Sequence, residues 1–326
     1  MKIFLTGGSG FLGSHIAEAA LGRGHEVAAL VRETSNLGFL KQLGVNLHFG
    51  ELRKPESVIE GLKGCEAVIH SAGLIKAKSL QEYIDVNVKG TADLLEMTAC
   101  CRPSLKRFVY ISSIAAQGPS PSPEPRGADL EPRTVSHYGE SKLLGEKEAL
   151  KYVGKFPVTV IRPPIIYGER DSEFLTVFKL IRRLRAITFM DGRQIVSMIH
   201  AADAAIAALM AVETEHPSGS IFPVDDGEGH TYQEMGKTIG RAMGVNVHPF
   251  KIPLAALKFT AFLFELYGRI TSQAVVFNMD KVNEAKQLYW VCGHEEIAKR
   301  IGWKPEISLT EGAKRTAEWY AKNGLL

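Results

Sequence analysis

Two short clusters in the middle of the chain contain residue types that can exchange protons. Tyr110-Ile111-Ser112-Ser113 ends an apolar run, and Tyr138-Gly139-Glu140-Ser141-Lys142 follows a proline-rich segment. Tyr138 and Lys142 are four residues apart, so in a helix they lie on one face. A phenol with an ordinary pKa of about 10 is a poor acid or base at neutral pH, and a nearby ammonium group favours the phenolate.

Lowering the Tyr138 pKa by about 3 units requires about 4 kcal/mol of differential stabilisation. We expect Lys142 and the positive charge of an oxidised nicotinamide to supply it. The phenol then exchanges a proton with a substrate hydroxyl or carbonyl while a nicotinamide exchanges hydride. Tyrosine and lysine at this spacing are also common on helix surfaces, so the interpretation needs a dinucleotide site elsewhere in the chain.

The first twenty residues supply that site. Lys2–Thr6 is a short apolar run, the glycines follow it at a regular spacing, and helical spacing begins near His15. A strand, a glycine turn and a helix N-terminus together bind dinucleotides, because the turn lets a pyrophosphate approach the backbone N–H groups. The predicted cofactor contacts in this turn are Gly7, Gly10, Phe11, Leu12 and Gly13.

The end of the second predicted strand bears on the choice of cofactor. An NAD site places an acidic residue about 20 positions past the glycines, on the ribose hydroxyl. Here Arg32 occupies that region, with Ser35 and Asn36 close behind. A cation and small donors suit the additional phosphate of NADP, so NADP(H) is preferred and NAD(H) stays open. The alternative is that Arg32 is a solvated strand-end residue and Glu33 binds the ribose.

Two further strand ends add cofactor contacts. Ligands of such sheets lie outside the carboxyl ends of the strands. We therefore predict that Glu51 and Leu52, after the third strand, and Ser71, Ala72 and Gly73, at the fourth, border the cofactor.

Strand and helix patterns alternate through the N-terminal half, which predicts right-handed crossovers and a doubly wound parallel α/β sheet of the Rossmann type. The predicted strands are 2–6, 26–31, 46–50, 67–71, 107–112 and 157–162, and the helices between them are 37–43, 55–62, 80–101 and 137–153. We predict a dinucleotide-binding domain over 1–170 and a smaller substrate lobe over 171–326, some segments of which return to the first sheet.

Composition indicates an ordinary globular protein. The 326 residues are 45% hydrophobic and 23% charged, with a formal net charge of +3. The basic residues are scattered, which argues against nucleic acid as a partner. The four cysteines lack metal-ligand spacing, so we expect no metal site and a reducing cytoplasm. A strand directly after Met1 leaves no room for a signal peptide.

Five segments together resemble the extended short-chain dehydrogenase/reductase superfamily: TGGSGFLG, Asn87-Val88-Lys89-Gly90-Thr91, YISSIAAQG, YGESK and IRPPIIYGE. The resemblance implies that Tyr138 is the acid–base residue and that Lys142 holds the nicotinamide ribose while lowering the Tyr138 pKa. It implies that Ser113 binds the reacting oxygen and that Asn87 supports the site through water. Pro163 and Ile166, in the last segment, are implied cofactor contacts. A homodimer is implied through helices 80–101 and 137–153.

Within the superfamily, IRPPIIYGERD and the apolar C-terminal stretch are most similar to the 3β-hydroxysteroid dehydrogenase and dihydroflavonol reductase branch. Nucleotide-sugar enzymes often carry asparagine where this chain has Ile165, and an isoleucine favours an apolar substrate. His200 and Asp203 match a segment shared with the sugar epimerases, or simply begin a helix with Asp203 in its first turn.

Two segments have open roles. Residues 117–132 contain five prolines and form a surface loop, which either covers a site or is a plain connection. The stretch 252–270 is the most apolar, yet it is too charged for a membrane span of about 20 residues. It caps a hydrophobic pocket, packs within the lobe or lies on a bilayer surface.

These observations predict an NADP(H)-dependent oxidoreductase that interconverts a secondary alcohol and a ketone on a sterol-, flavanol- or lipid-like substrate. The alternatives are a nucleotide-sugar epimerase or dehydratase and, from another class, a non-catalytic protein that senses NADPH.

Overall fold

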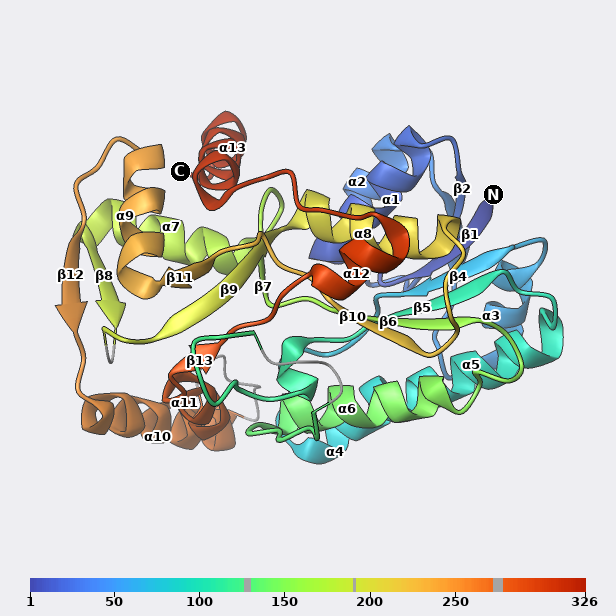
Figure 1. Ribbon diagram of the computed structural model, residues 1–326, viewed down its shortest axis with the longest axis horizontal. Helices are drawn as coiled ribbons and strands as arrows, with labels where there is room; N and C mark the ends of the chain where they lie inside the picture. Colours follow the sequence, from blue (N-terminus) through green and yellow to red (C-terminus); the bar gives the residue numbers. More distant parts are fainter. Residues whose placement is uncertain (126–129, 190–191, 272–277) are drawn as a thin grey trace.

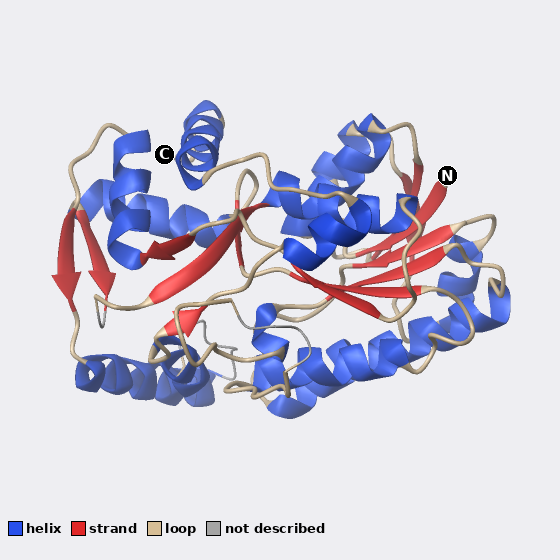
Figure 2. Ribbon diagram, in the orientation of Figure 1, coloured by secondary structure: helices blue, strands red, loops and turns tan. Residues whose placement is uncertain are grey.

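A computed structural model describes residues 1–125, 130–189, 192–271 and 278–326. Its larger part is a seven-stranded parallel sheet with the order β10-β6-β5-β4-β1-β2-β3, with helices on both sides (Figures 1 and 2). The strands are β1 (Lys2–Thr6), β2 (Glu26–Val31), β3 (Asn46–Phe49), β4 (Ala67–His70), β5 (Arg107–Ile111), β6 (Val158–Arg162) and β10 (Ser220–Pro223). The predicted doubly wound parallel fold is confirmed.

The strand sequences explain why this sheet is central. Most side chains of β1, β2, β4, β5 and β6 are buried on both faces, which requires near-continuous apolar runs. One face packs against α1 (Phe11–Gly22), α8 (Ala201–Glu213) and α12 (Glu295–Ile301). The other packs against α3 (Pro55–Leu62), α5 (Gly90–Cys101) and α6 (His137–Leu150). The short helix α2 (Gly38–Gln42) contacts α1.

The second half of the chain contributes to both parts of the molecule. β10 pairs in parallel with β6, and α8 packs on α1, so residues beyond 170 complete the large sheet and its cover. The smaller lobe has a sheet in which β9 (Ile195–His200) pairs with β7 (Ile165–Tyr167), β11 (Gly229–Thr231) and β13 (Tyr289–Trp290). A separate pair joins β8 (Ala186–Phe189) to β12 (His248–Lys251). Its helices are α7 (Ser172–Leu184), α9 (Tyr232–Ala242), α10 (Leu254–Thr271), α11 (Met279–Ala285) and α13 (Leu309–Lys322).

The helix predicted over 80–101 is continuous but not uniform. It begins as α4 (Leu80–Tyr83), widens into the π-helical segment η1 (Ile84–Lys89) and continues as α5. π-Helical turns are rare and gather at functional sites. This turn contains Asn87, which is only 1% exposed.

The apolar stretch 252–270 forms most of α10. Most of its described side chains are exposed, while Ala261 is buried and α10 contacts α11. The described residues of α10 do not line the cleft that contains Tyr138, and the role of this stretch stays a prediction. Among the described residues, no helix combines the length and apolar character needed to cross a bilayer.

Candidate active site

The glycine turn between β1 and α1 is closed too tightly for side chains. Gly7 has φ of +74°, and a Cβ there would lie 2.6 Å from the Ala72 nitrogen. A Cβ on Gly13 would lie 2.0 Å from the Gly7 carbonyl oxygen. The Gly10 N–H donates to that same carbonyl at 2.9 Å. The backbone of this glycine turn is therefore not covered by side chains of its own, and it lies at the carboxyl edge of the sheet.

This turn fits a dinucleotide. Gly10 caps α1 without a side chain, so a ligand can reach the N–H groups of the first helical turn. Arg32 is exposed at the carboxyl end of the neighbouring strand β2, and its guanidinium contacts no other described residue by a hydrogen bond or ion pair. A glycine cradle beside an unpaired cation suits an adenine dinucleotide with an anionic group near its ribose.

The residues after β2 and β3 lie outside the cleft that contains Tyr138. The Ser35 hydroxyl accepts the Arg32 N–H at 3.2 Å, and the Asn36 side chain accepts the Gly38 N–H at 3.2 Å. Glu51 pairs with Lys54 at 3.0 Å on the surface. Leu52 packs toward Gly90. These residues shape the edge of the sheet, and their cofactor contacts stay a prediction.

Lys142 is fixed in the wall of the site. It is 5% exposed, and its Nζ donates to the Ile111 carbonyl at 2.6 Å, at the end of β5. The same Nζ lies 4.4 Å from the centroid of the Tyr110 ring. Burial lowers the Lys142 pKa to about 7, against the opposing effect of Glu146. This amine can therefore change protonation near neutral pH.

Tyr138 lies beside Ser113 and forms a hydrogen bond with its side chain. Tyr138 is half-buried in the first turn of α6, and Ser113 follows β5. Burial raises the Tyr138 pKa, the hydrogen bond with Ser113 lowers it, and the Glu284 and Tyr83 side chains raise it further. The predicted lowering by Lys142 is therefore not what the protein chain by itself produces, because desolvation of the phenolate dominates.

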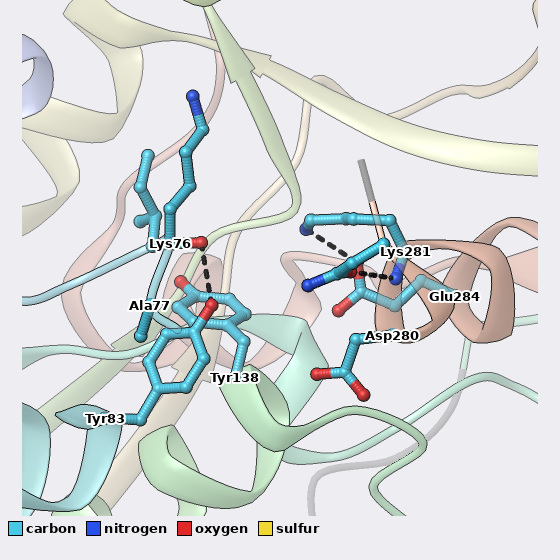
Figure 3. A pocket seen from close by; sticks show the side chains of 9 residues that line it. Lys76, Ala77, Tyr83, Tyr138, Asp280, Lys281 and Glu284 are labelled. Atoms are coloured by element: carbon cyan, nitrogen blue, oxygen red, sulfur yellow. Dashed lines mark hydrogen bonds and ion pairs between the residues drawn. The ribbon is translucent and has the colours of Figure 1, made fainter. Parts of the chain in front are cut away.

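A helix from the far end of the chain covers Tyr138. Figure 3 shows Asp280, Lys281 and Glu284 of α11 grouped beside Tyr138 and Tyr83. The Asp280 carboxylate accepts the His137 N–H at 2.7 Å, which fixes α11 to the start of α6. Lys281 lies 5.7 Å from the Tyr138 ring centroid and pairs with Glu284 at 2.7 Å. Nothing near residue 280 resembles a motif, so the sequence does not predict this group.

Asn87 acts through direct hydrogen bonds. Its side-chain oxygen accepts the Leu74 N–H at 2.7 Å, and its amide nitrogen donates to the Leu74 carbonyl at 3.0 Å and to the Ser141 hydroxyl at 2.9 Å. Asn87 thus holds the segment after β4 against α6. It positions the wall of the cleft and does not itself line it.

A buried ion pair supports the same wall. Arg162 and Glu146 are each 2% exposed and joined by two hydrogen bonds of 2.8 and 2.7 Å. The Ser112 hydroxyl also donates to Glu146 at 2.5 Å. Glu146 lies four residues beyond Lys142 on α6, so helical spacing was the one available signal for it.

The glycine turn and the catalytic cluster open into one cleft of about 530 Å³. The described residues that line it include most predicted ones: Gly7, Gly10, Phe11, Leu12, Gly13, Ser71, Gly73, Ser113, Tyr138, Lys142, Pro163 and Ile166. Ala72 is close by, with its N–H on the Thr6 hydroxyl at 3.3 Å. The lobe side adds Ile165 and Phe174.

Two other predicted segments lie away from the cleft. His200 caps α8, and Asp203 in its first turn accepts the Ile307 N–H at 2.9 Å, so both have structural roles there. In the proline-rich loop, the described residues 117–125 and 130–132 do not line the cleft. Residues 126–129 of that loop lie outside the described part of the chain.

Comparisons with known proteins agree with this geometry. Residues 3–224 match the NAD dependent epimerase/dehydratase family, and the chain belongs to that family. It is 29% identical to a ceramide reductase of Caulobacter vibrioides over 99% of this chain and 96% of that protein. It is also 29% identical to a 4-hydroxy-2-methyl-3-oxo-4-farnesyl-3,4-dihydroquinoline-1-oxide ketoreductase of Stigmatella aurantiaca, over 84% of this chain and 83% of that protein. The fold matches UDP-glucose 4-epimerase of Thermotoga maritima with a TM-score of 0.80 at 21% identity, over 99% of both chains.

The class of protein follows from the family, the fold and the site together. The chain is an NAD(P)-dependent oxidoreductase of the extended short-chain dehydrogenase/reductase type. Its relatives also agree with the predicted resemblance to the 3β-hydroxysteroid dehydrogenase-like branch.

Proposed function

We propose that this enzyme uses NADP(H) to interconvert a secondary alcohol and a ketone on a largely apolar, lipid- or sterol-like molecule. The observation that carries the proposal is the lining of the cleft. Among its described lining residues, Lys142 is the only cation, whereas Asp171 and Glu173 are acidic and Ile75, Ile165 and Phe174 are apolar. A nucleotide sugar brings its own diphosphate, which needs basic partners that this lining does not offer.

The names of the sequence relatives support the same substrate class. The first relative is named for reduction of a ceramide, and the second for ketone reduction on a quinoline oxide that carries a farnesyl group. The epimerase of similar fold is the reason to keep a nucleotide-sugar epimerase or dehydratase as the second candidate.

For the cofactor, Arg32 supports NADP(H). Its exposed guanidinium stands at the strand end where the adenine ribose binds in such sheets, and a bidentate donor suits a phosphate. Glu33 is exposed at the same strand end and is the residue that would bind the ribose of NAD(H).

The chain's own residues then divide the work. The glycine turn and Arg32 hold the dinucleotide, whose nicotinamide supplies or accepts the hydride. Ser113 binds the substrate oxygen, and Tyr138 donates a proton to that oxygen during reduction or removes one during oxidation. Lys142 holds the ribose, and its protonated form acts together with the positive charge of the oxidised nicotinamide to offset the burial that raises the pKa of the phenol. Asn87 and Glu146 position this cluster and touch no reacting atom.

Two further proposals accompany this function. We propose a homodimer formed through the helices over 80–101 and 137–153, as the resemblance implies. We also propose a cytoplasmic location.

Substrate panels test the proposed function. Oxidation of NADPH and NADH is followed by absorbance with long-chain β-keto lipids and 3-ketosteroids, and UDP-glucose and UDP-glucuronic acid are assayed in parallel for epimerised products. We expect NADPH-dependent turnover of at least one apolar ketone. Epimerisation of a UDP-sugar, without turnover of any apolar ketone, would replace this proposal by the second candidate.

A further inference from the structure

Helix α10 carries its apolar side chains on the side that faces away from the protein. Its contacts with the rest of the chain are made mainly with α11, and the inward positions are Leu257, Ala261, Glu265 and Gly268. Leu254, at the start of the helix, is 38% exposed, and the most exposed large apolar side chains are those of Phe259, Phe262, Leu263, Phe264, Leu266 and Tyr267, each 45–63% exposed. A helix on the surface of a soluble domain normally shows the reverse pattern.

Helical geometry places the centre of the exposed apolar face of α10 opposite the face that contacts the protein. With a rotation of 100° per residue, Phe259, Leu263 and Leu266 lie opposite Ala261 and Gly268. These six side chains span an arc of about 200°, from Phe262 round to Phe264. A single partner helix buries a stripe of about 100°, so a second copy of α10 would leave half of this arc in water.

The charges near this face are basic. Lys258 lies on the flank of α10, and Lys251, in the adjoining strand β12, is also exposed. The one described carboxylate of α10, Glu265, is turned inward and accepts the Met279 N–H of α11 at 2.8 Å. Phe250, next to Lys251, is 64% exposed. An apolar face bordered by cations complements a surface of anionic lipid.

We propose that α10 is an interfacial helix that docks this enzyme on the surface of an anionic lipid bilayer. The side chains of Phe259, Phe262, Leu263 and Leu266 enter the boundary between headgroups and acyl chains, and Lys258 contacts the headgroups. This proposal rests on exposure and charge alone, and it holds whether or not the proposed substrate class is correct.

The position of α10 links the docked surface to the active site. Glu265 fixes α10 to α11, and Asp280 of α11 fixes that helix to the start of α6, next to Tyr138. Figure 1 shows α10 at the periphery of the lobe with α11 beside it. Docking through α10 therefore brings the covered side of Tyr138 close to the bilayer.

Vesicle flotation of the full chain tests the proposal. The vesicles are phosphatidylcholine alone, or phosphatidylcholine with about one third phosphatidylglycerol. We expect the protein to float with the anionic vesicles. The triple variant Phe259→Ser, Phe262→Ser and Leu266→Ser should reduce the bound fraction at least about tenfold, because each lost side chain contributes to apolar burial. Lys258→Glu should weaken binding to the anionic vesicles several-fold.

The matched control is Leu180→Ser with Leu184→Ser on α7, where both leucines are also exposed. It should float as the wild type does, and unchanged thermal melting should show that all variants fold. Equal flotation of the triple variant and the wild type would overturn the proposal. The proposal would also be overturned if the wild-type protein does not float with anionic vesicles. Light scattering would then show whether the wild type is a monomer or a dimer that the triple variant abolishes, and either result would count against membrane docking.

Discussion

The two walls of the cleft differ in how they are built. On the sheet side, Ser113, Tyr138 and Lys142 are polar, and the buried pair Glu146–Arg162 lies behind them. On the lobe side, Ile165, Ile166 and Phe174 present apolar surface, while the carboxylate of Asp171 caps α7 and that of Glu173 pairs with Lys76. A polar group does chemistry only when its geometry is held, whereas an apolar wall selects a substrate by shape and by exclusion of water. One wall therefore defines the reaction, and the other defines what reacts.

Removing the phenol gives the sharpest test of the sheet wall. Tyr138→Phe keeps the ring but deletes the proton donor, so we expect kcat to fall by a factor of about 10² to 10⁴. The Kd for NADPH, measured by fluorescence titration, should stay nearly unchanged. If turnover survives, Tyr138 is not the acid–base group.

The buried ion pair should contribute most to the stability of this wall. Arg162→Met leaves the Glu146 carboxylate unpaired at 2% exposure, and we expect the free energy of unfolding to fall by about 3–5 kcal/mol in urea denaturation. Adding Glu146→Gln should recover part of that loss. The surface pair Arg300–Glu296 is the matched control, and Arg300→Met should cost less than about 1 kcal/mol. Equal losses in Arg162→Met and Arg300→Met would contradict this role.

The choice of cofactor tests the edge of the sheet wall. If Arg32 binds a phosphate, Arg32→Ala should raise the Kd for NADPH about ten- to a hundredfold and leave the Kd for NADH nearly unchanged. Glu33→Gln is the companion variant, because it should affect NADH more than NADPH if Glu33 binds the ribose. Equal weakening of both cofactors by Arg32→Ala would remove the support for NADP(H).

The smallest expected effect concerns the lobe wall. Ile165→Thr keeps the branch at Cβ, removes one methylene group and replaces a methyl group by a hydroxyl, so kcat/KM for an apolar ketone should fall about tenfold. Ile165→Val removes the same methylene group without adding polarity, and kcat/KM should fall less. Similar losses in both variants would show that volume at this position matters, and not polarity.

Local patterns in the sequence predicted most of the sheet wall. β1 and β2 begin and end as predicted, and the other four predicted strands differ by one residue at one end. Each pattern behind these predictions lies within about ten neighbouring residues: the continuous apolar runs, the spaced glycines and the four-residue separation of Tyr138 and Lys142. The division at residue 170 stays a prediction, although β10 and α8 show that the later part of the chain returns to the large sheet.

The sequence did not reveal the groups that side chains form across long separations. Asn87 binds Leu74 and Ser141 because a π-helical turn points it inward, and no periodicity predicts such a turn. The direction of the Tyr138 pKa in the protein chain alone also depends on the tertiary structure, because burial raises this pKa more than the hydrogen bond with Ser113 lowers it.

By itself, the sequence determined that this chain has a parallel sheet, a glycine turn for a dinucleotide and a tyrosine and lysine on one helical turn. These features depend on spacing along the backbone, which the sequence states directly. Only the tertiary structure decided that α11 covers Tyr138, through a hydrogen bond between residues 143 positions apart, and that the apolar face of α10 points outward. The burial of a side chain and its contacts depend on residues that are distant in the sequence and become neighbours only when the chain folds. The spacing of residues along the sequence does not specify those neighbours.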